Sequence, residues 1–193
     1  MDVNTMKALR MPVFSALFAA LIVVGAYLRI PIGPVPIVLS NFFVILAGAV
    51  LGAKWGGASI ALYLLLGIVG LPVFAGGGGL AYLRGPTGGF LLGYLPAGVL
   101  AGIIVTWKKR TNLSCILGLI AGAILIYVAG VPWLKVALEK TWPEAFTIGM
   151  LPFLPGDAAK VVAAFLVVRL LEKSYPEVLA NPRKAETDPP SLS

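Results

Sequence analysis

Residues 76–94 read GGGGLAYLRGPTGGFLLGY, a glycine-rich segment with one arginine that lies between two long hydrophobic runs. A segment that faces lipid cannot leave its backbone N–H and C=O groups unpaired, because the bilayer core offers no water to bind them. Irregular backbone at that depth is tolerated only where it is buried in protein or lines a cavity. We therefore expect Gly76–Gly89 to be irregular and to form the wall or lid of a polar pocket in an otherwise apolar protein.

The composition is that of an integral membrane protein. Of the 193 residues, 59% are hydrophobic and 12% are charged, whereas an ordinary soluble domain has about 25% charged residues. The mean hydropathy is +0.96. We expect an all-α protein with one transmembrane domain, residues 1–173, followed by a polar and flexible cytoplasmic tail, residues 174–193.

Several classes of site are excluded by residue content. The chain has no histidine and one cysteine, Cys115, which rules out an intramolecular disulfide, a histidine-based metal site and a Ser/His/Asp triad. The formal net charge is +7, but the basic residues flank the hydrophobic runs, so we expect a lipid bilayer and no nucleic acid as partner. The first ten residues lack the features of a cleaved signal, and we expect residues 11–29 to be a retained span.

We expect six transmembrane helices, at about 12–27, 37–51, 57–71, 88–107, 113–131 and 156–171, which puts both termini on one side. The opposite side then has Arg29, Arg84, Lys135 and Lys140, and Lys160 lies inside the sixth helix. The remaining ten of the 15 Lys and Arg residues lie on the side of the termini. The positive-inside rule therefore predicts cytoplasmic termini, with the glycine-rich loop before the fourth helix on the outer face.

Asp157 and Lys160 form the main candidate for chemistry. They lie in LPFLPGDAAKVVAAF, residues 151–165, at the start of the sixth expected helix. Residues three apart share one face of a helix, and such a pair is costly to bury at membrane depth without a function. Structural roles stay open for both residues: Asp157 can cap the helix, and Lys160 can extend to the membrane surface.

The glycine-rich loop supplies further candidates. Arg84 can pair with an anionic ligand group or with a lipid headgroup. Tyr82 and Tyr94 can line a pocket or belong to an interfacial aromatic belt. Gly76–Gly79 can allow close approach of the backbone to a ligand or simply be flexible.

Two helices carry small residues four positions apart, Ala16 and Ala20 in the first and Gly118 and Gly122 in the fifth. Such faces allow close helix contact, either within the protein or with a partner. The sequence has no phosphate-binding loop and no dinucleotide fingerprint, and no nucleophile or metal-ligand constellation accompanies the acid–base pair. We therefore expect a capture protein rather than an enzyme, with any transport energy supplied by a partner.

Three segments resemble the BioY family, the biotin-specific substrate-binding (S) components of energy-coupling-factor (ECF) transporters. They are PVPIVLSNFFVILAG (34–48), LPVFAGGGGLAYLRGPTGGFLLGY (71–94) and PFLPGDAAKVVAA (152–164), and the resemblance extends from Lys7 to Glu172. It implies a six-helix S-component fold in a bacterial cytoplasmic membrane, with biotin bound near the outer face. Family members often carry Thr and Gln where this chain has Val38 and Ser40, and Asn41 could take their place.

The resemblance also implies partners and roles. Ala16 and Ala20 would dock on a transmembrane coupling (T) subunit that two ATPase subunits drive, and the S component would rotate in the membrane to deliver biotin inward. No metal and no cofactor is implied, biotin being the transported ligand. The implied substrate-binding residues are Asp157, Lys160, Arg84, Tyr82, Gly77, Gly78, Gly79, Phe74, Thr87 and Asn41.

The chemistry of these residues suits biotin, which has two ureido N–H donors, a carbonyl oxygen, an apolar bicycle and a carboxylate. Asp157 can accept from a ureido N–H, and Lys160 or Arg84 can meet the carbonyl or the carboxylate. Phe74, Leu80 and Tyr82 can cover the ring system. Other hypotheses remain: another small vitamin or amide-bearing anion, a membrane enzyme, and a purely structural subunit. The sequence leaves open whether the protein works alone, as a homo-oligomer or with a coupling module.

Overall fold

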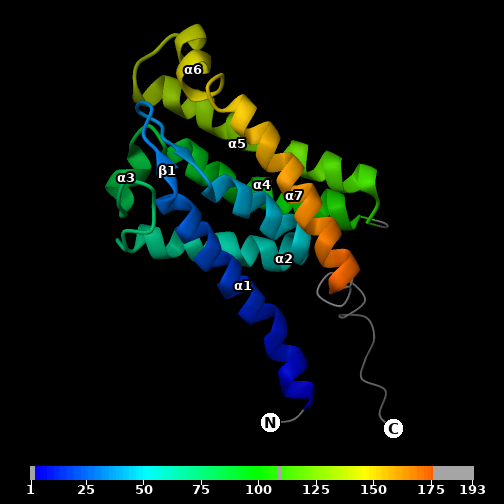
Figure 1. Ribbon diagram of the computed structural model, residues 1–193. Coiled ribbons are helices and arrows are strands. Elements are labelled where there is room, and N and C mark those ends of the chain that lie inside the picture. Colours follow the sequence, from blue (N-terminus) through cyan, green and yellow to red (C-terminus); the bar gives the residue numbers. More distant parts are fainter. Residues whose placement is uncertain (1–2, 108–109, 176–193) are drawn as a thin grey trace.

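The structure is a computed structural model that describes residues 3–107 and 110–175. In these residues seven helices and a two-stranded antiparallel hairpin follow one another along the chain (Figure 1). The protein is thus almost entirely helical, as expected, with seven helices rather than the predicted six. The elements are α1 (Val3–Tyr27), β1 (Arg29–Ile30), β2 (Ile37–Val38), α2 (Ser40–Ile68), α3 (Leu80–Arg84), α4 (Gly88–Thr106), α5 (Asn112–Ala137), α6 (Trp142–Gly149) and α7 (Leu154–Ser174).

Helix α2 is broken at Gly52, whose φ of 76° and ψ of 179° are non-helical and open only to glycine at little cost. The two arms run back along each other, since Gly56 of the second arm lies against Ala47 of the first (Figure 1). The sequence predicted two helices, 37–51 and 57–71, and the break lies in the predicted gap. Arg110 donates from Nη2 to the carbonyl oxygens of Ala49 (2.9 Å) and Val50 (3.4 Å), which lack helical partners because of the break.

The glycine-rich segment is less irregular than predicted. Leu80–Arg84 forms the short helix α3, and α4 already begins at Gly88, so the prediction of irregular backbone throughout Gly76–Gly89 is wrong. The four glycines before α3 do form a loop, in which Gly77 and Gly79 have positive φ angles of 144° and 85°. Helical hydrogen bonds in α3 reduce the number of backbone groups that the loop must satisfy in other ways.

Residues 132–155, which connect the fifth and sixth expected helices, are largely helical. Helix α5 continues through Pro132 to Ala137, α6 follows, and α7 begins at Leu154. Helix α6 starts with a capping box between Thr141 and Glu144, a pairing that satisfies free N–H groups at a helix start. This connection therefore consists mainly of helix.

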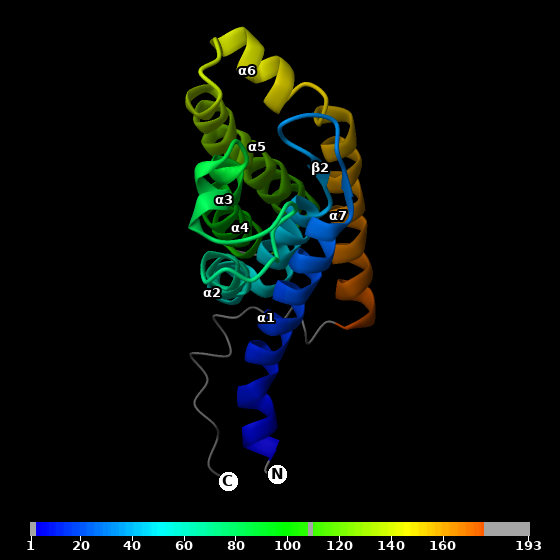
Figure 2. The same ribbon diagram turned by 90° about the vertical axis from the view of Figure 1, so that its left-hand side faces the viewer.

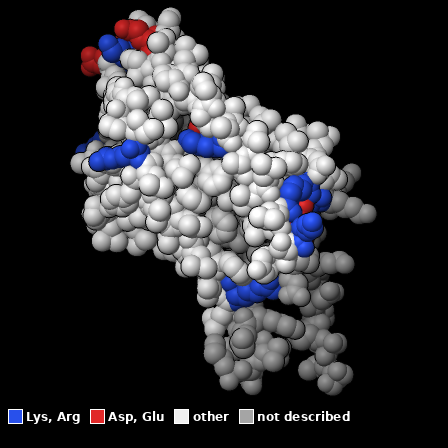
Figure 3. All heavy atoms as spheres, viewed as in Figure 1, with Lys and Arg blue, Asp and Glu red and all other residues white. Residues whose placement is uncertain are grey.

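In the described residues, four helical segments are long and apolar enough to cross a membrane: Leu9–Tyr27, Ser40–Ile68, Gly88–Thr106 and Asn112–Ala137. Helices α6 and α7 meet the same test only as a pair, with a bend of 49°. On the face in Figure 3, charged side chains form small separate groups with broad uncharged surface between them. These features are those of a multi-pass membrane protein.

Glycines let α2, α4 and α5 touch at the backbone. A Cβ atom added at Gly48 would collide with the carbonyl group of Gly98 on α4. Gly118 and Gly122 of α5 face Ala101 of α4 in the same way, so this predicted small-residue pair serves internal packing. Ala16 and Ala20 instead lie on the exposed side of α1. Helix α7 is peripheral, since only Ala164 and Val168 in it are fully buried.

The overall arrangement gives the molecule two ends. Helix α1 begins and α7 ends toward the lower side, whereas α6 and the β1–β2 hairpin lie at the upper side (Figure 2). The predicted tail, residues 174–193, lies outside the described residues from position 176 onward. The upper end, where the hairpin, α3 and α6 come together, is where the candidate site lies.

Gly48→Ala is expected to lower the free energy of unfolding by about 1–3 kcal/mol, because the new Cβ atom would push α2 and α4 apart. Gly156→Ala in α7 is the matched control, since no atom lies within 4 Å of its added Cβ, and it should leave stability unchanged or slightly higher. Thermal unfolding of the detergent-purified variants measures both. Equal midpoints for the two variants would contradict the backbone contact.

Candidate ligand-binding site

A cavity at the upper end of the bundle has about 590 Å³ of unfilled space, including its mouth. It is bounded by the hairpin and by residues from all seven helices. Its walls are mainly aromatic and aliphatic, with a few polar side chains, which is the usual make-up of a small-molecule site. The aromatic residues are Tyr63, Tyr82, Phe90, Tyr94, Tyr127 and Phe153, and the polar ones are Ser40, Asn41, Thr87, Asp157 and Lys160.

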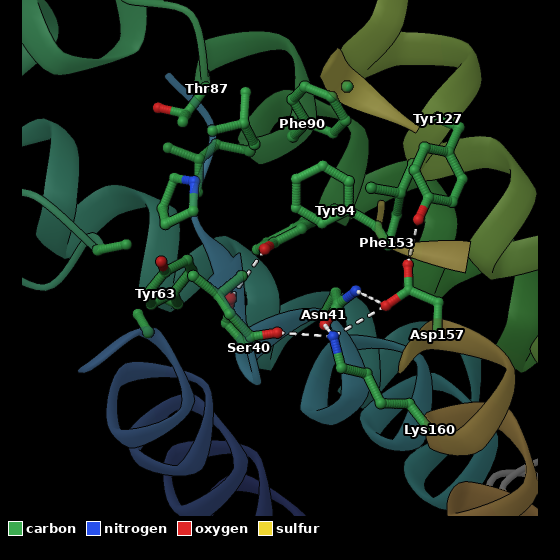
Figure 4. A pocket seen from close by; sticks show the side chains of 18 of the residues that line it. Ser40, Asn41, Tyr63, Thr87, Phe90, Tyr94, Tyr127, Phe153, Asp157 and Lys160 are labelled. Atoms are coloured by element: carbon green, nitrogen blue, oxygen red, sulfur yellow. Dashed lines mark hydrogen bonds and ion pairs between the residues drawn. The ribbon is translucent and has the colours of Figure 1, made fainter. Parts of the chain in front are cut away.

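Asp157 is the centre of a polar network on one side of this cavity (Figure 4). Its Oδ1 accepts from Asn41 Nδ2 (3.0 Å) and Lys160 Nζ (2.8 Å), and its Oδ2 accepts from the hydroxyl of Tyr127. These partners come from α2, α5 and α7. The network therefore connects three helices and presents one carboxylate to the cavity.

Lys160 has no free N–H donor in this arrangement. Its Nζ donates to Val38 O (2.7 Å), Asn41 Oδ1 (2.9 Å) and Asp157 Oδ1 (2.8 Å), and an ammonium group has three donors. The side chains of Lys160 and Asp157 are each 13% exposed. The pair is thus half-buried and has no net charge, and all three N–H donors of the ammonium group have acceptors.

The local fold explains why these groups meet. Leu39 N–H donates to Gly25 O (2.9 Å) at the end of α1, which fixes the hairpin and the start of α2 where Val38 and Asn41 lie. Pro155 in the first turn of α7 suits a helix start. Phe153 rather than Asp157 is the N-cap residue of α7, with no side-chain capping bond. The sequence left open that Asp157 is a cap and that Lys160 reaches the membrane surface, and neither arrangement is present.

A second polar group lies on another wall of the cavity. Ser40 Oγ and Tyr94 Oη are 2.8 Å apart and hydrogen-bonded. Tyr63 lies beside them, with its ring 6.4 Å from that of Tyr94. Sequence analysis did not select Tyr63 or Tyr127, and it named Tyr94 without a partner. Tyr63 and Tyr127 could have been selected because each places a hydroxyl in a long apolar span, where a polar group needs a hydrogen-bond partner.

The ten predicted substrate-binding residues divide into two sets. Those that line the cavity are Asn41, Tyr82, Thr87, Asp157 and Lys160. Those that do not are Phe74, Gly77, Gly78, Gly79 and Arg84.

Most residues of the second set contact or anchor the residues that line the cavity. Phe74 is buried and packs 5.5 Å from the rings of both Tyr63 and Tyr82. Gly79 N–H donates to Gly67 O (2.7 Å), which ties the loop to α2. Arg84 lies exposed at the end of α3, two residues from Tyr82 and three from Thr87. Residues 3–107 and 110–175 contain no cluster of acidic or sulfur ligands that could hold a metal ion.

Comparisons with known proteins agree with the geometry. The sequence profile of the BioY family matches residues 1–177. A probable biotin transporter BioY of Pyrococcus horikoshii is 42% identical over 158 residues, covering 81% of this chain and 93% of the relative. The biotin transporter BioY of Thermotoga maritima is 40% identical, covering 86% of this chain and 97% of the relative.

A solved structure matches as well. The crystal structure of the S-component for biotin from an ECF-type ABC transporter aligns with a TM-score of 0.81 and 32% identity, over 90% of this chain and 95% of that one. The resemblance drawn from residues 34–48, 71–94 and 152–164 is therefore confirmed. The relatives are named as transporters and not as enzymes.

Asp157→Asn and Lys160→Met are each expected to lower the free energy of unfolding by about 3 kcal/mol, because each leaves the other charge buried and unpaired. The double variant should lose less than the sum of the two. Thermal unfolding without ligand tests this, with Lys140→Met as control, since the Lys140–Glu144 pair is 41% and 48% exposed and should contribute little to stability. Strictly additive losses would contradict a coupled pair.

Proposed function

The chain belongs to the BioY family, and from that premise we propose that it is the biotin-binding S component of an ECF-type vitamin uptake transporter. In this proposal it captures biotin with high affinity at the outer face of the membrane and delivers it inward with a coupling module. The observation that carries the proposal is the Asp157 network, a half-buried carboxylate at the edge of an aromatic cavity. A cavity of this kind suits a ligand with N–H donors on an apolar ring system.

The ureido group is the part of biotin that Asp157 would bind. A carboxylate has about four lone-pair sites, and the described partners of Asp157 occupy three, two at Oδ1 and one at Oδ2. One site at Oδ2 therefore stays available for a ligand N–H. Phe90 and Phe153, which line the same region (Figure 4), offer apolar surface for the bicycle.

The carboxylate of biotin would need a different partner from Lys160. All three donors of Lys160 already have acceptors within the protein, so a contact with the ligand would break one of them. Arg84 is exposed and close in sequence to Tyr82 and Thr87, which line the cavity. We therefore assign the carboxylate to Arg84 at the rim, as a charge-assisted pair.

Delivery would depend on partners that bind α1. Of the two small-residue faces, Gly118 and Gly122 pack within the protein, whereas Ala16 and Ala20 are exposed. An exposed small-residue face at membrane depth suits close contact with another helix. We propose that this face docks on the T subunit, which two ATPase subunits drive, and that both termini lie in the cytoplasm.

The first experiment is equilibrium binding of biotin to the detergent-purified protein. Wild type should bind saturably, and Asp157→Asn should bind at least tenfold more weakly, since its amide accepts less strongly and disturbs the network. Binding is measured well below the unfolding midpoint of each variant. Glu144→Gln is the control, because Glu144 lies exposed on α6 away from the cavity, and it should bind as wild type does.

The carboxylate-blocked amide of biotin belongs in the same series. Weaker binding of the amide to wild type, with no such difference in Arg84→Gln, would support the assignment of Arg84. A folded wild-type sample that binds neither compound would rule out biotin and turn attention to another small vitamin or amide-bearing anion.

Ala16→Leu/Ala20→Leu should leave biotin binding unchanged and abolish co-purification with the T and ATPase subunits, because the larger side chains would keep the partner helix at a distance. The matched control is Leu170→Trp, a bulky substitution at an exposed position of α7, which should not affect assembly. Intact assembly of the double-leucine variant would show that α1 docks elsewhere or not at all.

A further inference from the structure

Tyr63 is a fully buried tyrosine whose hydroxyl is not used within the protein. It lies in the second arm of α2 with a relative exposure of 0%. Among the residues that the structure describes, no group hydrogen-bonds to its Oη. A buried hydroxyl without a partner costs free energy, and buried polar groups in native proteins nearly always have one.

Two other tyrosines that line the cavity behave differently. Tyr94 Oη is paired with Ser40, and Tyr127 Oη donates to Asp157. Tyr63 instead has aromatic neighbours, Phe74 edge-on at 5.5 Å and Tyr94 at 6.4 Å. These contacts fix its ring and leave the hydroxyl unsatisfied.

The position of Tyr63 points to a ligand as the missing partner. Tyr63 lines the same cavity as Asp157 and lies at the opposite side of it, with Tyr94 between them (Figure 4). The two sides also differ in chemistry. Asp157 can only accept from a ligand N–H, whereas a phenol can donate to an oxygen.

We propose that the Tyr63 hydroxyl hydrogen-bonds to an oxygen of the bound ligand and helps to select ligands that carry an acceptor oxygen as well as N–H donors. This rests on the proposed function in that the ligand is taken to be biotin, which has such oxygens in its ureido carbonyl and its carboxylate. The unpaired hydroxyl destabilises the empty protein and is satisfied when the ligand binds. Ligand binding would thus give the Tyr63 hydroxyl the hydrogen bond that it lacks in the empty protein, and this gain would contribute to affinity.

Tyr63→Phe tests the inference because it has opposite effects on stability and binding. It removes only the hydroxyl, so the thermal midpoint of the ligand-free protein should stay the same or rise, whereas the Kd for biotin should increase about three- to tenfold. Tyr94→Phe is the matched comparison: it leaves the Ser40 hydroxyl without its partner and should lower the midpoint of the ligand-free protein.

Analogues identify the oxygen. With an analogue that has a methyl group in place of the carboxylate, or with 2-iminobiotin, which lacks the ureido oxygen, the difference between wild type and Tyr63→Phe should disappear for one of the two. A difference that persists with both would overturn the contact with an oxygen. Unchanged or tighter binding of biotin to Tyr63→Phe, when wild type binds it, would overturn the inference alone, whereas no binding by wild type would overturn the proposed function itself.

Discussion

The hydrogen bonds of Lys160 join parts of the chain that apolar packing holds together only weakly. Helix α7 buries just Ala164 and Val168 completely, yet its Lys160 reaches the backbone of Val38 and the side chain of Asn41. Such bonds are stronger in a low-dielectric interior than in water. The placement of α7 depends on this ammonium group, which also orients the Asp157 carboxylate together with Asn41 and Tyr127.

The acid–base pair of this network could be predicted from the sequence because charges inside apolar segments are rare and costly. Asp157 and Lys160 were recognisable from their three-residue spacing in a hydrophobic run, whereas Asn41 was selected through the family resemblance. The break in α2 lies between the two helices predicted at 37–51 and 57–71, where glycines and a lysine interrupt the apolar run. The use of Ala16 and Ala20 by a partner is still a prediction.

Other features depend on contacts that no local pattern encodes. The bond between Ser40 and Tyr94 joins residues 54 positions apart, and that between Tyr127 and Asp157 joins residues 30 apart. Helices α3 and α6 have five and eight residues, too few to be stable without tertiary packing. In the glycine-rich segment, Tyr82 and Thr87 line the cavity and Arg84 does not. The sequence alone could not distinguish these side chains.

The backbone contact of α2 with α4 also has a consequence for the speed of ligand exchange. Where Gly48 meets Gly98 no side chain intervenes, so at this point the two helices have no side-chain rotamers through which to yield. The bonds that secure α7 can instead be exchanged one at a time for water. We expect ligand entry to be limited by how often those polar contacts open, while amide hydrogens in the α2–α4 core exchange slowly throughout.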